Sequence, residues 1–354
     1  MPKAEYTITL HDPKKDTDEE VAERVEFSNA YQAEILPDEE PTPVEEAIAG
    51  LRASPERFKR WSFRARDAEG NLAGIGSTTI DPDERDNPDI LSFSITVGSA
   101  HRRNGLGTRL LDELVRVAQA EGKTRILLNT NGLVPAGEEF ARAVGAESKN
   151  AMHMNRVKVS NIDRPMLEKW VAEGPARAQG YELFGWDDNV ADEHMEQYIG
   201  IVLVMNTAPR DDLEINDFTI TPDEIREQEK VARAQGVESW TLVARHIESG
   251  EWAGYHDVHW SPSDPKKVYV GATGVRPENR GHALGKWLKA QMQLRILDER
   301  PQVDEVRTGN ADSNDAMLGI NKQMGYEHWI AASTWEVSVE QAAKWLASRG
   351  MQTA

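Results

Sequence analysis

A stretch of fifteen residues occurs twice in this chain, and this duplication constrains the fold more than any other feature of the sequence. The first version, VGSAHRRNGLGTRLL, begins at Val97, and the second, VRPENRGHALGKWLK, begins at Val275. The two are 178 positions apart, about half of the 354 residues, and a later glycine pair, Gly145 and Gly325, is 180 positions apart. A repeat of this length indicates a duplicated domain rather than a solenoid.

The spacing of apolar residues predicts the same order of elements in both halves. In the first half we expect a strand at 6–10, a helix at 19–36, strands at 60–66, 71–80 and 90–97, a helix at 105–119, a strand at 125–129, a helix at 138–143 and a strand at 152–159. In the second half we expect a strand at 181–185, helices at 192–204 and 221–235, strands at 239–246, 251–260 and 267–275, a helix at 283–297, a strand at 304–309, a helix at 314–323, a strand at 326–337 and a last helix at 340–347.

Composition excludes several classes of protein. The chain has no cysteine, which excludes disulfides, thiolate metal sites and a cysteine nucleophile. No apolar run approaches the length of a membrane span, and the N-terminus lacks the apolar core of a secretory signal, so we expect a cytoplasmic protein with no membrane partner. The net charge of −19 disfavours a nucleic-acid partner. That acidity indicates either a well-solvated surface or attraction of a cationic small molecule.

The repeated stretch has the features of an anion site. A strand leads into a glycine turn, and a helix begins at once, so that free backbone N–H groups and the helix dipole both favour a negative ligand. Other phosphate motifs fit poorly. A Walker loop needs four residues between its glycines, whereas Gly281 and Gly285 enclose three, and a dinucleotide fingerprint needs a third glycine where Leu110 stands.

The pattern R-x-x-G-x-G after a strand, within this order of elements, resembles the GNAT superfamily of N-acetyltransferases. Residues 102–107 match the pattern fully, and residues 280–285 match it with Ala283 at the first glycine position. The resemblance covers essentially the whole chain as a tandem pair, an architecture similar to that of mycothiol synthase. It implies an α/β (α+β) fold of two GNAT-like domains, each with a mixed, mostly antiparallel sheet flanked by helices. We expect the domains at residues 1–158 and 181–354, joined by a linker helix at 159–180.

The resemblance also implies the acyl donor, acetyl-CoA, and its contacts. In the GNAT superfamily the turn binds the pyrophosphate, and the splayed fourth strand offers backbone groups to the pantetheine arm. The implied contacts are Val97, Arg102, Arg103, Asn104, Gly105, Leu106, Gly107 and Thr108 in the first half, and Val275, Arg280, Gly281, His282, Ala283, Leu284, Gly285, Lys286, Asn310 and Asn314 in the second.

A second motif of the superfamily distinguishes the halves. In the second half Asn314 stands eleven residues before Gly325, where the superfamily has an asparagine, but Asn321 replaces the tyrosine that often protonates the departing thiolate. In the first half Val134 and Ala141 occupy the corresponding places. We therefore expect the second half to be catalytic and the first to be structural or to bind the coenzyme non-productively.

Proton transfer is expected from the strand that carries GYHDVHW. Alternation places Asp257 and His259 on one face and His256 on the other, so either Asp257 or His259 could relay a proton through water, or both are ordinary polar strand residues. Because His256 and His259 lie on opposite faces, we expect no metal site. Trp329 and Trp335, on the last strand, are candidates to line the acceptor groove.

The resulting hypothesis is an N-acetyltransferase that transfers acetyl directly from acetyl-CoA to the amine of a small molecule, and the acidity of the chain favours a cationic acceptor. Two alternatives stay open: a catalytically silent acetyl-CoA-binding protein, motivated by Asn321, and mycothiol synthase proper. The sequence leaves the oligomeric state open.

Overall fold

The computed structural model describes residues 5–351 and divides the chain into two compact units. Unit 1 comprises residues up to Ala151, Asp212–Asn216 and the segment from Ala332 onward. Unit 2 comprises Met152–Asp211 and Asp217–Ala331. The outermost residues of the predicted domains, 1–4 and 352–354, lie outside the described part of the chain.

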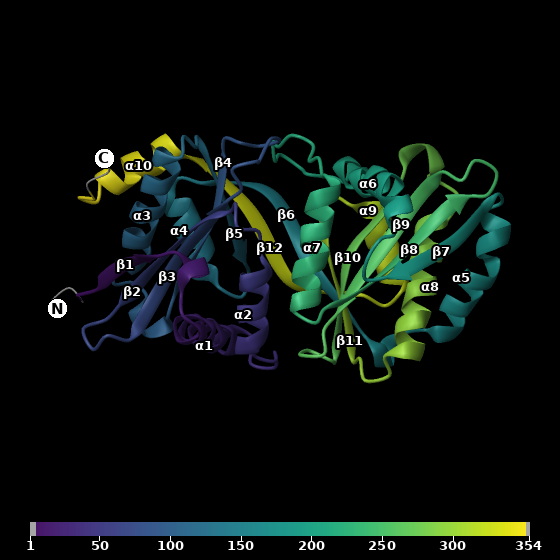
Figure 1. Ribbon diagram of the computed structural model, residues 1–354, viewed down its shortest axis with the longest axis horizontal. Coiled ribbons are helices and arrows are strands. Elements are labelled where there is room, and N and C mark those ends of the chain that lie inside the picture. The colour runs from purple at the N-terminus through teal and green to yellow at the C-terminus, as the bar shows by residue number, and fades with distance from the viewer. Residues whose placement is uncertain (1–4, 352–354) are drawn as a thin grey trace. The chain divides into compact units, whose positions relative to one another are not determined.

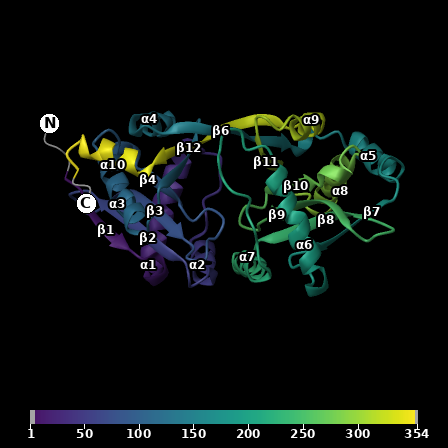
Figure 2. The ribbon, with the colours of Figure 1, turned by 90° about the horizontal axis from the view of Figure 1, so that it is seen from above.

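Unit 1 is a mixed, mostly antiparallel sheet between two layers of helices (Figures 1 and 2). Its strands follow the order β1 (Thr7–His11), β2 (Lys59–Arg66), β3 (Leu72–Ile80), β4 (Ile90–Val97), β5 (Arg125–Asn131) and β12 (Glu327–Ser338). Its helices are α1 (Asp18–Ile35), α2 (Val44–Ala53), α3 (Leu106–Ala120), α4 (Pro135–Val144) and α10 (Val339–Ala347). The core joins the sheet to α3 and α10 through residues such as Leu110, Leu114 and Leu346.

Unit 2 repeats this plan, with α5 and α8 on one side of its sheet and α6 and α7 on the other (Figure 2). Its strands follow the order β6 (Glu147–Lys158), β11 (Glu305–Ala311), β10 (Lys267–Val275), β9 (Trp252–Trp260), β8 (Glu238–His246) and β7 (Tyr181–Asp187). Its helices are α5 (Arg164–Arg177), α6 (Met195–Val202), α7 (Pro222–Ala234), α8 (Leu284–Glu299) and α9 (Asp315–Gln323).

Each unit completes its sheet with a strand from the other half of the sequence. Residues Met152–Lys158 of β6 pair with β11, whereas Ala332–Ser338 of β12 pair with β5. The units therefore differ from the predicted domains at 1–158 and 181–354, because the last strand of each half hydrogen-bonds in the sheet of the other. The predicted linker at 159–180 also differs, since α5 packs along α8 within unit 2. Gly174 permits this packing: a Cβ there would lie 2.6 Å from the Trp287 ring.

Local sequence explains where several helices begin. Thr17 and Thr221 open α1 and α7 with capping boxes completed by Glu20 and Glu224. Helix α2 was not predicted, although Val44, Ala47, Ile48 and Leu51 have helical spacing. None of the helices within residues 5–351 has the length and apolar character needed to cross a bilayer.

The two central parallel strands of each unit diverge. Strands β4 and β5 are paired over Ile90–Ser92, and β10 and β11 over Lys267–Tyr269; in the described residues neither pair continues beyond these points. Only one of the two splayed strands is also irregular toward its other neighbour. Strand β10 has a bulge against β9 between Val270 and Thr273, whereas β4 pairs with β3 without a register shift. Bulges of this kind are common next to active sites because they re-aim backbone and side-chain groups.

Candidate functional site

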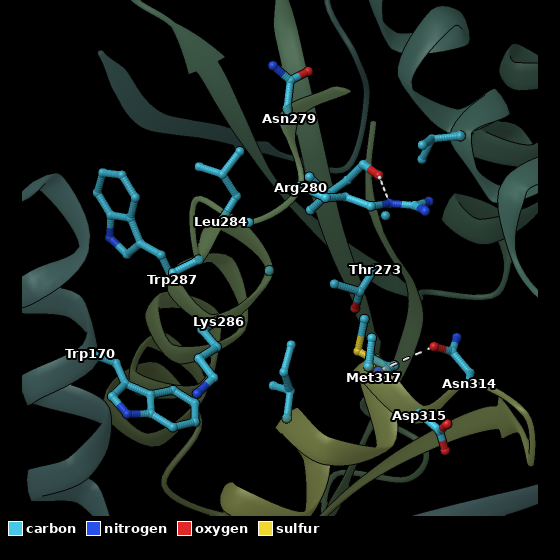
Figure 3. A pocket seen from close by; sticks show the side chains of 18 of the residues that line it. Trp170, Thr273, Asn279, Arg280, Leu284, Lys286, Trp287, Asn314, Asp315 and Met317 are labelled. Atoms are coloured by element: carbon cyan, nitrogen blue, oxygen red, sulfur yellow. Dashed lines mark hydrogen bonds between the residues drawn. The ribbon is translucent and has the colours of Figure 1, made fainter. Parts of the chain in front are cut away.

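A large cavity of unit 2 lies at the end of the splayed strand β10, where the chain enters α8 (Figure 3). We call it the unit 2 cleft. It has a volume of about 860 Å³, within the range of sites for substrates and cofactors. Its walls come from α5, from the segment Val204–Pro209, from β10, from the turn and first residues of α8, and from the start of α9. Thr273, Gly274 and Val275 form the β10 part of the wall.

The turn into α8 offers an anion a set of backbone donors. Ala283 is the N-cap residue, and its side chain provides no capping hydrogen bond. The first N–H groups of α8 therefore point out of the helix without a side-chain acceptor, and no acidic residue lies in the first turn. Ala283 adopts a left-handed conformation, with φ of 58° and ψ of 17°. The equivalent residue of unit 1, Gly105, has φ of 81° and ψ of 1°, so alanine preserves the turn at a cost in backbone strain.

The first arginine of each turn is placed alike but paired differently. Nε of Arg102 donates to the carbonyl of Val97 at 3.1 Å, and Nε of Arg280 donates to that of Val275 at 3.2 Å (Figure 3). The outer nitrogens of Arg102 form a two-point ion pair with Glu34, at 2.8 and 3.2 Å. Arg280 instead donates to the hydroxyl of Thr207 at 2.7 Å. Because the Thr207 hydroxyl is uncharged, it does not neutralise the positive charge of Arg280 in the unit 2 turn.

The corresponding cavity of unit 1, the unit 1 cleft, is smaller. It has a volume of about 490 Å³ and is lined by the 102–108 turn, the end of β4, the end of β5 and α4. The second arginine of its turn, Arg103, is exposed, and its Nη1 atom lies 3.5 Å from Oε2 of Glu139. Both clefts thus have a glycine turn in the wall, but the unit 1 turn has carboxylates beside both arginines.

Most of the predicted coenzyme residues line one of the two clefts. Those in the unit 1 cleft are Val97, Arg102, Arg103, Gly105, Leu106, Gly107 and Thr108, and those in the unit 2 cleft are Val275, Arg280, Gly281, Ala283, Leu284, Gly285, Lys286 and Asn314. Three predicted residues lie outside the walls: Asn104, His282 and Asn310. The His282 ring packs near Tyr181, with ring centroids 5.7 Å apart.

The asparagines of the second motif have structural partners. The side chain of Asn314 caps α9 by accepting the N–H of Met317 at 3.3 Å, and it still faces the cleft (Figure 3). Nδ2 of Asn321 donates to Oδ1 of Asn310 at 2.7 Å. Asn321 is only 2% exposed, and its Oδ1 has no hydrogen-bond partner among the described residues. The Asn310 oxygen is thus occupied by another side chain.

Asp257 and His259 lie together on one face of β9, as strand alternation predicts. They lie beneath the bulge of β10, on the face that α6 and α7 cover. Nε2 of His259 is 3.0 Å from Oδ2 of Asp257, and Nδ1 is 2.9 Å from the hydroxyl of Ser239. Oδ1 of Asp257 accepts the N–H of Ala272, a residue of the bulge, at 2.9 Å. The carboxylate is therefore fixed against the strand that also forms the wall of the cleft.

Two phenols surround this carboxylate. Burial raises the pKa of Tyr198 and of Tyr255 well above the usual range for a phenol, and the negative charge of Asp257 raises both pKa values further. Both tyrosines therefore keep their protons at neutral pH, and Asp257 is the anionic group of this cluster. On the opposite face, burial lowers the pKa of His256 to about 3, and the nearby Lys289 charge contributes.

The described part of unit 1 has no counterpart of this cluster. Gly74 pairs with Val97 as Gly254 pairs with Val275, so these glycines are equivalent. Three residues further along each strand stand Ser77 in unit 1 and Asp257 in unit 2. The hydroxyls of Ser77 and Ser94 are hydrogen-bonded to each other at 2.9 Å. Unit 1 thus lacks both the carboxylate and the bulge at this place.

Several functional candidates escaped the sequence-based reasoning. Helix α5, predicted as a linker, contributes Trp170 and Lys169 to the unit 2 cleft, and the Nζ atom of Lys286 lies 4.7 Å from the centre of the Trp170 ring. Gly271 leaves the room that Asp257 occupies, since a Cβ there would lie 2.1 Å from Oδ2. A glycine inside a predicted strand is a recognised signal of a bulge and could have indicated this site.

The two tryptophans proposed for the acceptor groove have different surroundings. Trp335 is 5% exposed in the core of unit 1, and its Nε1 donates to Thr130 at 2.8 Å. It is a core residue because β12 joins the sheet of unit 1. The prediction that Trp335 lines the acceptor groove was therefore wrong. Trp329 is partly buried in unit 2, where the Arg307 guanidinium lies 3.9 Å from its ring centre.

One group of side chains in the described residues could by distance hold a metal ion: His11, Asp16 and Glu20 of unit 1. Each carboxylate already has a structural partner. Asp16 forms a buried ion pair with Arg64, and Glu20 accepts the N–H of Thr17 in the capping box of α1.

Comparison with known proteins identifies the fold. Residues 25–145 match the family model described as Acetyltransferase (GNAT) family. Among solved structures, the chain is similar to a tandem GNAT protein from the clavulanic acid biosynthesis pathway, with 22% identity, a TM-score of 0.75, and coverage of 95% of this chain and 99% of that one. It is also similar to a GCN5-related N-acetyltransferase from Sphaerobacter thermophilus, with 13% identity, a TM-score of 0.65, and coverage of 94% and 96%. None of the curated proteins matches the sequence significantly.

Proposed function

We propose that this chain, which carries a GNAT acetyltransferase domain in residues 25–145 and the tandem GNAT fold throughout, transfers acetyl from acetyl-CoA to the amine of a small molecule. We place the reaction in unit 2. The observation that carries this proposal is that β10 both splays from β11 and has a bulge, and that the bulge anchors a carboxylate of the neighbouring strand β9. Strand β10 diverges from β11, opens into the unit 2 cleft, and holds Asp257 through the N–H of Ala272.

The unit 2 cleft suits the coenzyme. The unpaired N–H groups at the start of α8 and the guanidinium of Arg280 would bind the pyrophosphate. The backbone of β10 beyond Tyr269, which lacks β11 partners in the described structure, would bind the pantetheine arm. Trp170 and Lys286 line the same cleft and would contact the rest of the coenzyme.

The chemistry that these residues support is direct attack of a neutral amine on the thioester. Asp257 and His259 would accept the proton of the incoming ammonium, and the fixed geometry of the bulge would hold the reacting groups close together. No cysteine is present to form an acyl-enzyme, so a covalent cysteine intermediate has no nucleophile.

We propose for unit 1 a non-productive or structural role. Its cleft is smaller, its turn arginines lie beside Glu34 and Glu139, and Ser77 stands in place of the carboxylate. If coenzyme binds there, the structure offers no anchored base for acyl transfer.

A second candidate is a protein that binds acetyl-CoA without turnover. Asn321 favours it, because a buried amide bonded to Asn310 offers no hydroxyl to protonate the thiolate. Release of free thiol from acetyl-CoA, measured with a panel of small amines, distinguishes the two. Amine-dependent thiol release supports the transferase, whereas tight acetyl-CoA binding without release across the panel supports the silent binder.

A further inference from the structure

A second cavity of unit 2 lies under α7, on the side of the sheet that carries Asp257. We call it the α7 cavity. It has a volume of about 330 Å³, at the small end of the range for ligand sites. The lining residues that matter here are Trp186, Tyr198, Ala232, Ser239, Thr241 and Asp257.

The bulge of β10 separates the α7 cavity from the unit 2 cleft. Asp257 lines the cavity and accepts the N–H of Ala272, and the next residue, Thr273, lines the cleft. A molecule in the cavity and a thioester in the cleft would therefore approach the bulge of β10 from its two sides. His259, which also lines the cavity, is held in place by Asp257 on one ring nitrogen and by Ser239 on the other.

The charges around the cavity favour a cation. Its acidic residues are Asp188, Glu229, Glu238 and Asp257. Glu229 and Glu238 are paired with Arg226 and Arg300. Oδ1 of Asp188 accepts the N–H of Ser239 at 3.1 Å. Asp257 has an amide and an imidazole as partners, so its charge remains available to a ligand. The lining also includes one arginine, Arg233, whose side chain is exposed to solvent. The pKa of Tyr198 is raised by burial first, and then by the charges of Asp257 and Glu229, which places the phenol in the same negative potential.

Aromatic and hydroxyl groups complete the lining. The rings of Trp186 and Tyr198 stand edge to face, 5.6 Å apart, and form a wall of the kind that binds organic cations. Thr241 is 5% exposed and lines the cavity.

We infer that the α7 cavity is the acceptor subsite, and that it takes a small primary amine as its ammonium cation. This inference rests on the proposed acetyl transfer. The ammonium would sit against Asp257 and the aromatic wall, and would give one proton through the Ser239 hydroxyl to Nδ1 of His259. The neutral amine then forms a C–N bond with the acetyl carbon as the C–S bond breaks, and the amine's second proton goes to the departing thiolate.

The test uses the full-length protein saturated with CoA. Each amine of a panel (1-aminobutane, 1,4-diaminobutane and 2-phenylethylamine) and the alcohol analogue of each are titrated calorimetrically. At least one amine is expected to bind about tenfold or more tighter than its alcohol. Ala232→Leu, which fills the cavity, and Asp257→Asn, which removes its charge, are each expected to weaken that amine about tenfold or more.

Ala234→Leu is the matched control, because Ala234 lies on the same helix but is exposed and outside the cavity. It is expected to leave amine binding unchanged, and CoA binding should be unchanged in all three variants. Equal binding of amine and alcohol, equal binding to Ala232→Leu, or no binding by any panel member at millimolar concentration would each overturn the inference.

Thiol release separates this inference from the proposed function. An amine that binds in the cavity, is weakened by Ala232→Leu and yet releases no thiol from acetyl-CoA supports the cation site while contradicting the transferase. An amine that is acetylated with a KM unchanged by Ala232→Leu supports the transferase while overturning the cavity as its acceptor site.

Discussion

Nε2 of His259 lies 3.0 Å from Oδ2 of Asp257, and the other oxygen of that carboxylate accepts the N–H of Ala272 in the bulge of β10. The pair is thus tied to the strand that forms the wall of the unit 2 cleft. Asp257→Asn keeps the shape of the side chain but removes its charge. We expect kcat for amine acetylation to fall about 10²–10⁴-fold, with acetyl-CoA affinity unchanged.

Steady-state thiol release and calorimetric titration of acetyl-CoA measure these two quantities. Ser77→Ala, at the equivalent position of unit 1, is the control and should leave kcat unchanged. A full-rate Asp257→Asn enzyme would show that the carboxylate is a structural ligand of the bulge.

Gly271 is expected to control the position of that carboxylate. A Cβ at Gly271 would lie 2.1 Å from Oδ2 of Asp257 and 2.7 Å from Nε2 of His259, so Gly271→Ala must displace both side chains. We expect turnover to fall to the level of Asp257→Asn, while circular dichroism reports an intact fold. Gly319→Ala, where a Cβ meets nothing within 4 Å, is the control for introducing a methyl group.

Bulky substitutions in the two glycine turns should separate the roles of the units. A Cβ on Gly285 has ordinary contacts, the nearest at 3.7 Å, so Gly285→Trp would project its ring into the cleft without disturbing the helix. We expect Gly285→Trp to abolish acetyl-CoA turnover. Gly107→Trp, the matched change in unit 1, should leave turnover intact and remove any second equivalent of coenzyme seen by calorimetry. The reverse pattern would make unit 1 the catalyst.

Ala283 stands where the unit 1 turn has Gly105, and replacing it with glycine tests how much its left-handed backbone lowers the stability of the protein. Its φ of 58° is strained for a side chain, so Ala283→Gly should raise the free energy of unfolding by about 1 kcal/mol. Gly105→Ala introduces the same strain in unit 1, where a Cβ meets nothing within 4 Å, and should lower stability by about the same amount. Thermal denaturation monitors both. A loss of stability in Ala283→Gly would mean that its methyl group makes a favourable contact.

The buried Lys289 is expected to make the free energy of unfolding depend on pH. It is 1% exposed in α8, and burial lowers its pKa to about 8. Below pH 8 both the folded and the unfolded states carry the proton, and the folded state bears the full cost of the buried charge. As pH rises from 8 toward the unfolded pKa of about 10.4, the folded state is neutral and the cost disappears.

Lys289→Met should therefore stabilise the protein at pH 7, on the order of 3 kcal/mol, with a difference from wild type that shrinks above pH 8. Denaturant unfolding at pH 7 and about pH 9.5 measures this. Lys322→Met, at an exposed position of α9, should show no such dependence. A constant difference across this range would mean that the pKa of Lys289 is not lowered in the folded protein.

The sequence by itself determined the parts of this protein that depend on local patterns. The duplicated turn predicted two units of one plan, and its glycines and arginines line both clefts because strand, turn and helix start are contiguous in the chain. Alternation along one strand placed Asp257 and His259 on the same face, since side chains of a strand alternate whatever lies beside it.

Tertiary structure alone decided how strands are paired and what surrounds these residues. The exchange of β6 and β12, the packing of α5 beside the cleft, and the position of Ser239 against His259 all join segments that are distant in the sequence. Such pairings are selected by the free energy of burying whole faces of sheets and helices, which no single window of residues contains. The bulge that fixes Asp257 likewise exists only because β9 and β10 lie side by side.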